Sequence, residues 1–243
     1  MALLMALPLM AFGQNHQDQL DDSARIVVDR YLTMLNIEGL PADSLLVMET
    51  AITTSTNTRD TIWMRRWYAA PEKFRVEMWY EETMTFGLVS NGKDRFKRYL
   101  TADKKWEVLT KTEFYKKLQG YDFRGHLYDW RGKGAELIWN GTTTLKGHDL
   151  QVVKVKCKDM YNRYYMFEPG TGLLTLIIET DEMMNGNHFE SSSRIEWKME
   201  HEFQPLHESL LPSLESFMRN EELTIFQTRY RFEAMDNEIF ERD

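Results

Sequence analysis

The chain has 243 residues, a formal net charge of −8, 42% hydrophobic residues and 28% charged residues. This composition excludes an intrinsically disordered chain, because the apolar fraction is large enough for a sizeable core. The negative net charge argues against nucleic acid as a partner. With a single cysteine, Cys157, the chain cannot form an intramolecular disulfide.

The N-terminus has the pattern of a secretory leader. Residues 2–12 are almost wholly apolar, and a polar run begins directly after Gly13. We therefore predict that residues 1–13 are a signal peptide and that residues 14–243 form one mature, exported domain. No Lys or Arg precedes the apolar run, which indicates a truncated leader. The run is also shorter than the roughly 20 apolar residues that a membrane-spanning helix needs.

One amphipathic helix is expected early in the mature chain. Its start is marked by Asp22 or Ser23 as a cap, and its end by Gly39 and Pro41. The apolar residues between these signals fall at spacings of three and four, which predicts one apolar face lying on a larger element. These residues are Ala24, Val27, Val28, Tyr31 and Leu35.

Most of the remaining chain alternates apolar and polar residues with the period of two that is typical of half-buried strands. Asn91-Gly92 predicts a tight type I′ hairpin, and Asn140-Gly141 and Lys146-Gly147 predict further turns. The pattern favours a mainly β protein with a strongly curved antiparallel sheet or an incomplete barrel. We predict strands at 45–54, 62–68, 74–80, 84–88, 96–100, 106–109, 135–139, 151–157, 163–167, 173–180, 195–199 and 223–232.

Two segments interrupt the succession of strands. Residues 112–118 are expected to form a short capped helix. Residues 121–133 hold several aromatic residues and two glycines without either period, which predicts a loop or lid over one mouth of the sheet. The same aromatic residues could equally plug the core.

Charge is spread unevenly along the chain. Residues 91–117 contain nine Lys or Arg against four Asp or Glu, whereas residues 179–243 contain six against sixteen. The basic stretch could dock an acidic partner or anionic headgroups. Its charges alternate with aromatic residues, however, so a solvated strand face explains it as well.

Residues for catalysis or metal binding form no recognisable constellation. The chain has no nucleophile elbow, zinc-protease motif, glycine-rich phosphate loop or Cys-x-x-Cys pair. His201 and His207 are the nearest approach to a ligand pair, but their spacing suits neither one helix face nor one strand face. We therefore expect a protein that is not an enzyme and that has no catalytic residues, metal or cofactor.

Four segments resemble the LolA/LolB-like superfamily of outer-membrane lipoprotein-sorting proteins. They are PEKFRVEM (71–78), VSNGKDRFKRY (89–99), GYDFRGHLYDWRGKG (120–134) and VKCKDMYNRYYMFEPGTGLL (155–174). The resemblance spans roughly residues 20–240 and implies an incomplete antiparallel β-barrel around a hydrophobic cavity, with helices as a lid.

The resemblance also implies a function. A soluble periplasmic carrier would bind lipoprotein acyl chains or lipids during outer-membrane biogenesis, with a lipoprotein-trafficking partner in the inner or outer membrane and peripheral membrane contact. The alternative on the same fold is an envelope interaction or stress-sensing module that docks a protein partner.

One parity of the strands, roofed by the helix, would line the cleft. The alternative for each of these residues is ordinary core burial. The predicted lining is Phe74, Val76, Met78, Met84, Phe86, Leu88, Ile195, Trp197, Val27, Val28, Tyr31 and Leu35.

Overall fold

A computed structural model describes residues 11–56, 60–118, 120–125, 127–145, 147–156, 162–180, 196–219 and 222–242. The predictions for residues 1–10 of the leader, for Cys157 and for Ile195 lie outside these ranges.

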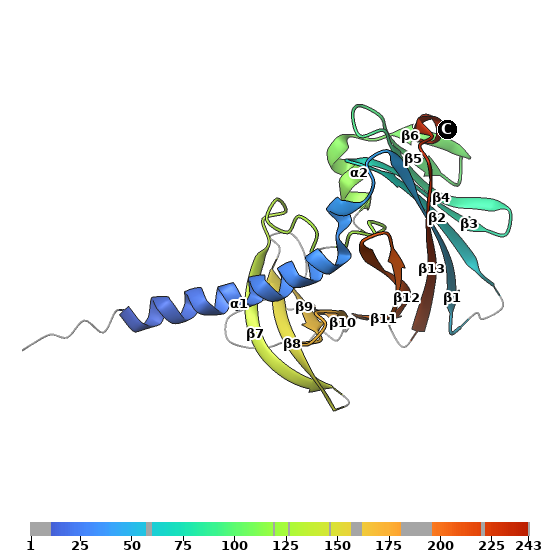
Figure 1. Cartoon of the computed structure of the whole chain (residues 1–243). Coiled ribbons are helices and arrows are strands. Elements are labelled where there is room, and N and C mark those ends of the chain that lie inside the picture. The colour runs from blue at the N-terminus through green and yellow to red at the C-terminus, as the bar shows by residue number, and fades with distance from the viewer. Residues whose placement is uncertain are drawn as a thin grey trace, which may run out of the picture.

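The described residues form one antiparallel sheet of thirteen strands, which curves strongly and does not close (Figure 1). The helix α1 (Ala11–Leu35) runs across the open side of the curve. The mainly β fold class expected from the sequence is thus confirmed. The strands are β1 (Ser44–Thr54), β2 (Ile62–Ala69), β3 (Lys73–Tyr80), β4 (Thr83–Ser90), β5 (Phe96–Leu100), β6 (Lys105–Val108), β7 (Glu136–Leu145), β8 (His148–Lys156), β9 (Asn162–Phe167), β10 (Leu174–Thr180), β11 (Glu196–Leu206), β12 (Ser209–Arg219) and β13 (Glu222–Ala234).

The order of the strands determines where the sheet is open. Strands that follow each other in the chain pair with each other, except β6 and β7, and β1 also pairs with β13, so the first and last strands meet in the middle of the sheet. The two edges are therefore β6 and β7, which are consecutive in the chain. Their connection contains the helix α2 (Lys111–Leu118) and the loop that follows, and it lies on the open side of the curve.

The two faces of β1 are both buried, each under a different cover. Leu46 and Met48 belong to the main core cluster on the concave face. Leu45 and Val47 belong to a second cluster with Phe240, in the short 3₁₀ helix η2 (Asn237–Phe240), which covers the convex face. A strand buried on both faces reads as a continuous apolar run rather than an alternation. This explains the run of apolar residues at the start of β1.

Helix α1 differs from its predicted boundaries at both ends. It is already helical at Ala11, so neither Asp22 nor Ser23 caps its start. It stops at Leu35 because Asn36 adopts a left-handed conformation (φ 44°), a common way to end a helix. A 3₁₀ turn, η1 (Ile37–Gly39), follows. The predicted end at Gly39 was therefore about one turn too late.

Two predicted turns are wrong in kind. At Asn91-Gly92 only the glycine has a positive φ (78°), whereas a type I′ turn needs both residues there. The connection is a longer loop, in which the Asn91 side-chain oxygen accepts hydrogen bonds from the backbone N–H groups of Lys93 and Arg95. Asn140-Gly141 is not a turn but lies inside β7, at a register shift between Trp139 and Thr142.

Strand β12 is not among the predicted strands, and it contains a proline, Pro212, a residue that is otherwise confined to edge strands and bulges. The sheet accommodates Pro212 because its ladder with β13 begins only at Leu214. At the proline, β12 pairs with β11 alone, through Phe203. The missing N–H therefore removes no hydrogen bond on the β13 side.

A buried ion pair connects the sheet to the C-terminal turn. Arg75 and Glu77 follow each other on the convex face of β3, with Nε and Oε1 2.6 Å apart and both side chains largely buried. The Arg75 guanidinium also donates to the backbone carbonyls of Ile239 (2.9 Å) and Arg242 (2.8 Å). One side chain thus compensates a buried carboxylate and holds η2 on the sheet.

We predict that Arg75→Ala lowers the free energy of unfolding by about 3–5 kcal/mol, because Glu77 then stays buried without its partner. The control is Arg65→Ala, which removes an exposed ion pair with Glu49 and should cost about 1 kcal/mol or less. Urea denaturation measures both. Equal losses in the two variants would contradict this account of Arg75.

Candidate functional site

A cavity of about 530 Å³ lies between the concave face of the sheet and the segment that crosses its open side. Its walls come from α1 and α2, from strands β1, β2 and β9 to β13, and from the loop after α2. The lining residues are Tyr31, Thr50, Met64, Arg66, Lys116, Gly120, Tyr121, Asp122, Phe123, Arg124, Gly125, Leu127, Arg163, Tyr165, Leu174, Ile177, Lys198, Pro212, Glu215, Phe217, Phe226 and Tyr230.

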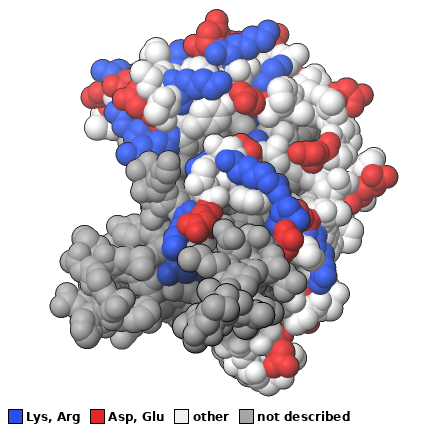
Figure 2. All heavy atoms as spheres, turned by 90° about the vertical axis from the view of Figure 1, so that its left-hand side faces the viewer, with Lys and Arg blue, Asp and Glu red and all other residues white. Residues whose placement is uncertain are grey.

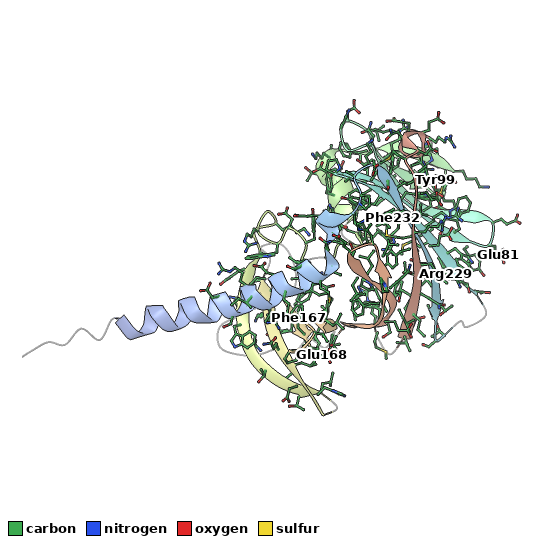
Figure 3. The ribbon with its side chains drawn as sticks, in the orientation of Figure 1. Glu81, Tyr99, Phe167, Glu168, Arg229 and Phe232 are labelled. Carbon is green, nitrogen blue, oxygen red and sulfur yellow. The ribbon has the colours of Figure 1, made fainter. Side chains whose placement is uncertain are left out.

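The apolar part of this wall is aromatic to an unusual degree. Strands β12 and β13 contribute Phe217 and Phe226, which are half-buried, and β9 contributes Tyr165, which is fully buried. Tyr31 of α1 also lines the cavity, and its ring packs on Phe167 of β9, with centroids 5.6 Å apart. Figure 3 labels Phe167 on the sheet beside α1. Aromatic side chains offer large apolar surfaces with few rotatable bonds, so this wall is stiff and already formed.

Helix α1 is fixed over the sheet at its C-terminal half. Val28 and Leu35 are buried in the main core cluster. Arg30 Nη1 donates to the backbone carbonyl of Pro169 (2.9 Å), and the Arg30 stem lies against Gly172, where an added Cβ would come within 2.7 Å of it. Gly172 thus lets the turn between β9 and β10 approach the helix closely.

The loop after α2 covers the cavity from the other side. Tyr121 packs on Phe86 of β4 (centroids 4.6 Å apart), and Phe123 packs on Tyr68 of β2 (5.2 Å). Tyr121 and Phe123 also line the cavity. The sequence left open whether the aromatic loop is a lid or a plug for the core; these contacts give it both roles.

Arg124 fixes the shape of this loop. Its guanidinium binds the Asp122 carboxylate through two hydrogen bonds of 2.8 Å, from Nε and Nη2, and lies over the rings of Phe74 (4.7 Å) and Tyr128 (4.5 Å). Burial acts to lower the pKa of Arg124, but the hydrogen bond and charge of Asp122 outweigh it and raise that pKa. Burial also raises the pKa of Tyr121, which keeps its hydroxyl neutral at the cavity wall.

Within the described residues, the cavity wall carries more positive than negative charge. Its basic residues outnumber the acidic pair, Asp122 and Glu215. Lys198 is ion-paired with Glu215. The basic residues of the wall are Arg66, Lys116, Arg124, Arg163 and Lys198.

Residues 91–117, the most basic segment of the sequence, do not form a similar excess of positive charge on the outer surface. Within residues 91–117, Arg98 pairs with Glu107 (2.5 Å) and Lys105 with Asp103 (3.1 Å). The face seen in Figure 2 shows basic and acidic side chains intermixed. These observations favour a solvated strand face for the basic stretch over a docking patch.

Of the predicted lining residues, Tyr31 borders this cavity. Others lie in the main core cluster or against it, and Met84 pairs with Trp79 at a register shift between β3 and β4. Trp197 lies in β11 opposite Met218, and Ile195 is outside the described residues. Whether any of them touches a ligand stays a prediction. The residues in or against the core are Val27, Val28, Leu35, Phe74, Val76, Met78, Phe86 and Leu88.

Sequence reasoning missed the charged residues of the wall. In β2, Met64, Arg66 and Tyr68 occupy one parity, and all three are buried. A basic residue at an inward-facing strand position was the signal that could have revealed the site. Arg163 has a comparable place in β9, two residues before Tyr165.

Other site types find little support in the part of the chain that the structure describes. No group of three or more His, Cys, Asp or Glu residues is placed to hold a metal ion there. No described helix combines the length and apolarity needed to cross a membrane.

Comparison with known proteins identifies the fold. No family model matches the chain, and no curated protein matches it. Among solved structures, a LolA superfamily protein of Nitrosomonas europaea is similar with a TM-score of 0.57 and 10% identity, covering 90% of this chain and 98% of that one.

Two further structures agree. A domain assigned to outer membrane lipoprotein sorting in Vibrio parahaemolyticus has a TM-score of 0.56 at 10% identity, covering 92% of this chain and 97% of the other. A DUF1329 family protein of Desulfovibrio piger has a TM-score of 0.58 at 11% identity, covering 89% of this chain and 96% of the other. The chain thus has the LolA-like fold, as the resemblance implied.

We predict that Arg124→Ala loosens the lid loop without unfolding the sheet, because it removes both the bidentate pair and the ring contacts. Hydrogen exchange in residues 120–134 should speed up at least tenfold, while exchange in β1 and β13 stays unchanged. Arg124→Lys should not restore protection, since an ammonium cannot reproduce the planar, bidentate contact. Unchanged exchange in the loop of the alanine variant would contradict this role.

Proposed function

We propose that the protein is an exported, periplasmic binding or carrier protein for the acyl chains of a lipid or lipoprotein, and that the cavity under the lid holds the chain. The observation that carries the proposal is the cavity of about 530 Å³, a volume within the usual range of ligand sites. Its aromatic wall and the LolA-like fold support the same function. The outer-membrane sorting role expected from the sequence is part of this proposal.

The energetics of such a site favour reversible binding. Each buried methylene contributes about 0.8 kcal/mol, so a fully sheltered chain of 16 carbons offers a gross gain of roughly 11–13 kcal/mol. Association costs on the order of 4–15 kcal/mol. One chain in a partly open cavity is therefore held weakly enough to be released, as transfer to a partner requires.

The lid gives a route for entry and release. It is one continuous segment between the two sheet edges, so it can move without breaking any strand pairing. Its contacts with the sheet include ring contacts, such as Tyr121 on Phe86 and Phe123 on Tyr68. These separate at lower cost than a β ladder.

Two neighbouring residues of β13 provide a matched test. Phe226 lines the cavity, whereas Ile225 is 39% exposed. We predict that Phe226→Glu weakens binding of the uncharged fluorescent probe 1-N-phenylnaphthylamine at least tenfold, because it places a carboxylate in the apolar wall. Ile225→Glu should change it less than twofold. Circular dichroism checks that both variants are folded.

Absence of probe binding by the wild-type protein, or equal loss in the two variants, would sink the proposal. Native mass spectrometry of protein purified from cells offers a second readout, since co-purified acyl species are expected. An empty protein that instead retains a protein from the cell envelope would favour the docking module as the function.

A further inference from the structure

The cavity holds a buried cation, Arg66, whose hydrogen-bond partners among the described residues are all neutral. Arg66 is 8% exposed and lines the cavity wall. Its Nη2 donates to the hydroxyl of Thr50 (3.2 Å), and its Nη1 makes a long contact with the backbone carbonyl of Tyr121 (3.4 Å). Its Nε is buried and has no hydrogen-bond partner among the described residues.

This arrangement is costly for a structural arginine. A guanidinium has five N–H donors and stays charged at any physiological pH. A buried charge is normally compensated by an opposite charge, because desolvation of an ion costs several kcal/mol. In the described structure, no salt bridge to Arg66 is present, whereas Arg124 and Lys198 of the same wall each have a carboxylate partner.

The other polar groups around Arg66 cannot supply the missing negative charge. The Thr50 hydroxyl is also hydrogen-bonded to the Thr228 hydroxyl across the β1–β13 ladder (2.9 Å). Arg66 thus belongs to a hydrogen-bond network whose other members are two uncharged, buried hydroxyls. Tyr121, whose pKa burial raises, stays uncharged. Arg163, also buried, adds a second cation to the wall.

We propose that the ligand is an amphiphile with an anionic headgroup, a phosphate or carboxylate, which Arg66 binds inside the cavity while the acyl chain lies along the aromatic wall. The inference deepens the proposed function and rests on it. A planar guanidinium forms strong, paired hydrogen bonds with either anion. Charge selection therefore accompanies hydrophobic binding, and an uncharged lipid of equal chain length is disfavoured.

The test compares two ligands with the same chain, dodecyl phosphate and 1-dodecanol, as displacers of 1-N-phenylnaphthylamine. The wild-type protein should bind dodecyl phosphate at least tenfold more tightly than 1-dodecanol. Inorganic phosphate alone should bind at least a hundredfold more weakly than dodecyl phosphate, which distinguishes a lipid headgroup from a free anion.

The variants are Arg66→Met and its neighbour Arg65→Met, which alters the exposed face of the same strand. Arg66→Met should reduce the preference for dodecyl phosphate at least fivefold and leave the affinity for 1-dodecanol unchanged or higher. Arg65→Met should keep the wild-type preference. Arg66→Lys should keep part of the preference for dodecyl phosphate, since lysine retains the positive charge but lacks the paired N–H donors of the guanidinium.

The outcomes separate the two proposals. Equal affinities of the wild-type protein for the two ligands would overturn the headgroup inference and leave acyl-chain binding intact, whereas binding of neither would overturn both. Tight binding of inorganic phosphate would show a free-anion site and overturn the inference.

Stability gives an independent readout, because methionine removes a buried charge that has no carboxylate partner. Arg66→Met should therefore unfold at a urea concentration no lower than the wild type. A large loss of stability would make Arg66 a structural residue and overturn its assignment to a ligand.

Discussion

The pairing of β1 with β13 in the middle of the sheet is the constraint on which the site depends. It places the edges at two strands that follow each other in the chain, β6 and β7. The twist of a sheet this wide curves it, and the connection between its edges then has to cross the open side. The cavity is the space left between a stiff concave wall and a segment whose position the strand order imposes.

The two faces of the sheet differ in how their buried charges are compensated. On the convex face, the buried Arg75 and Glu77 compensate each other and accept η2 as a cover. On the concave face, the described partners of the buried Arg66 are a hydroxyl and a backbone carbonyl. The buried charges of Arg75 and Glu77 on the convex face therefore neutralise each other. On the concave face, the positive charge of Arg66 lies beside an apolar wall without a described carboxylate partner. Such an imbalance is typical of functional sites rather than of structural cores.

The low identity to proteins of the same fold has a physical explanation. At 10–11% identity, this chain shares with these proteins its overall fold, with TM-scores of 0.56 to 0.58. A curved meander requires inward apolar positions and turn residues, but it does not require particular side chains. The wall of the cavity can therefore carry different charges in different members of the fold, which makes ligand selection a property of each chain.

The sequence by itself determined the sheet, because alternation is a local pattern that the neighbouring strands enforce. Phe74, Val76 and Leu88 were expected on one face and are buried together in the main core cluster. It also located the helix, α2 and the aromatic loop. It did not predict β12, where Pro212 is tolerated because β13 has not yet joined the ladder, and it predicted a turn at Gly141, which lies at a register shift inside β7.

Only the tertiary structure decided the site. Arg66 has the strand parity of a core residue, but no local pattern reveals that Thr50 and Tyr121 are its partners in the described part of the chain. These two residues come from β1 and from the loop after α2. The separation of the aromatic cavity wall from the loop after α2 likewise depends on contacts between segments far apart in the chain, such as Tyr121 on Phe86. A sequence specifies which residues face inward; the charge they meet there is decided by which segments the fold brings together.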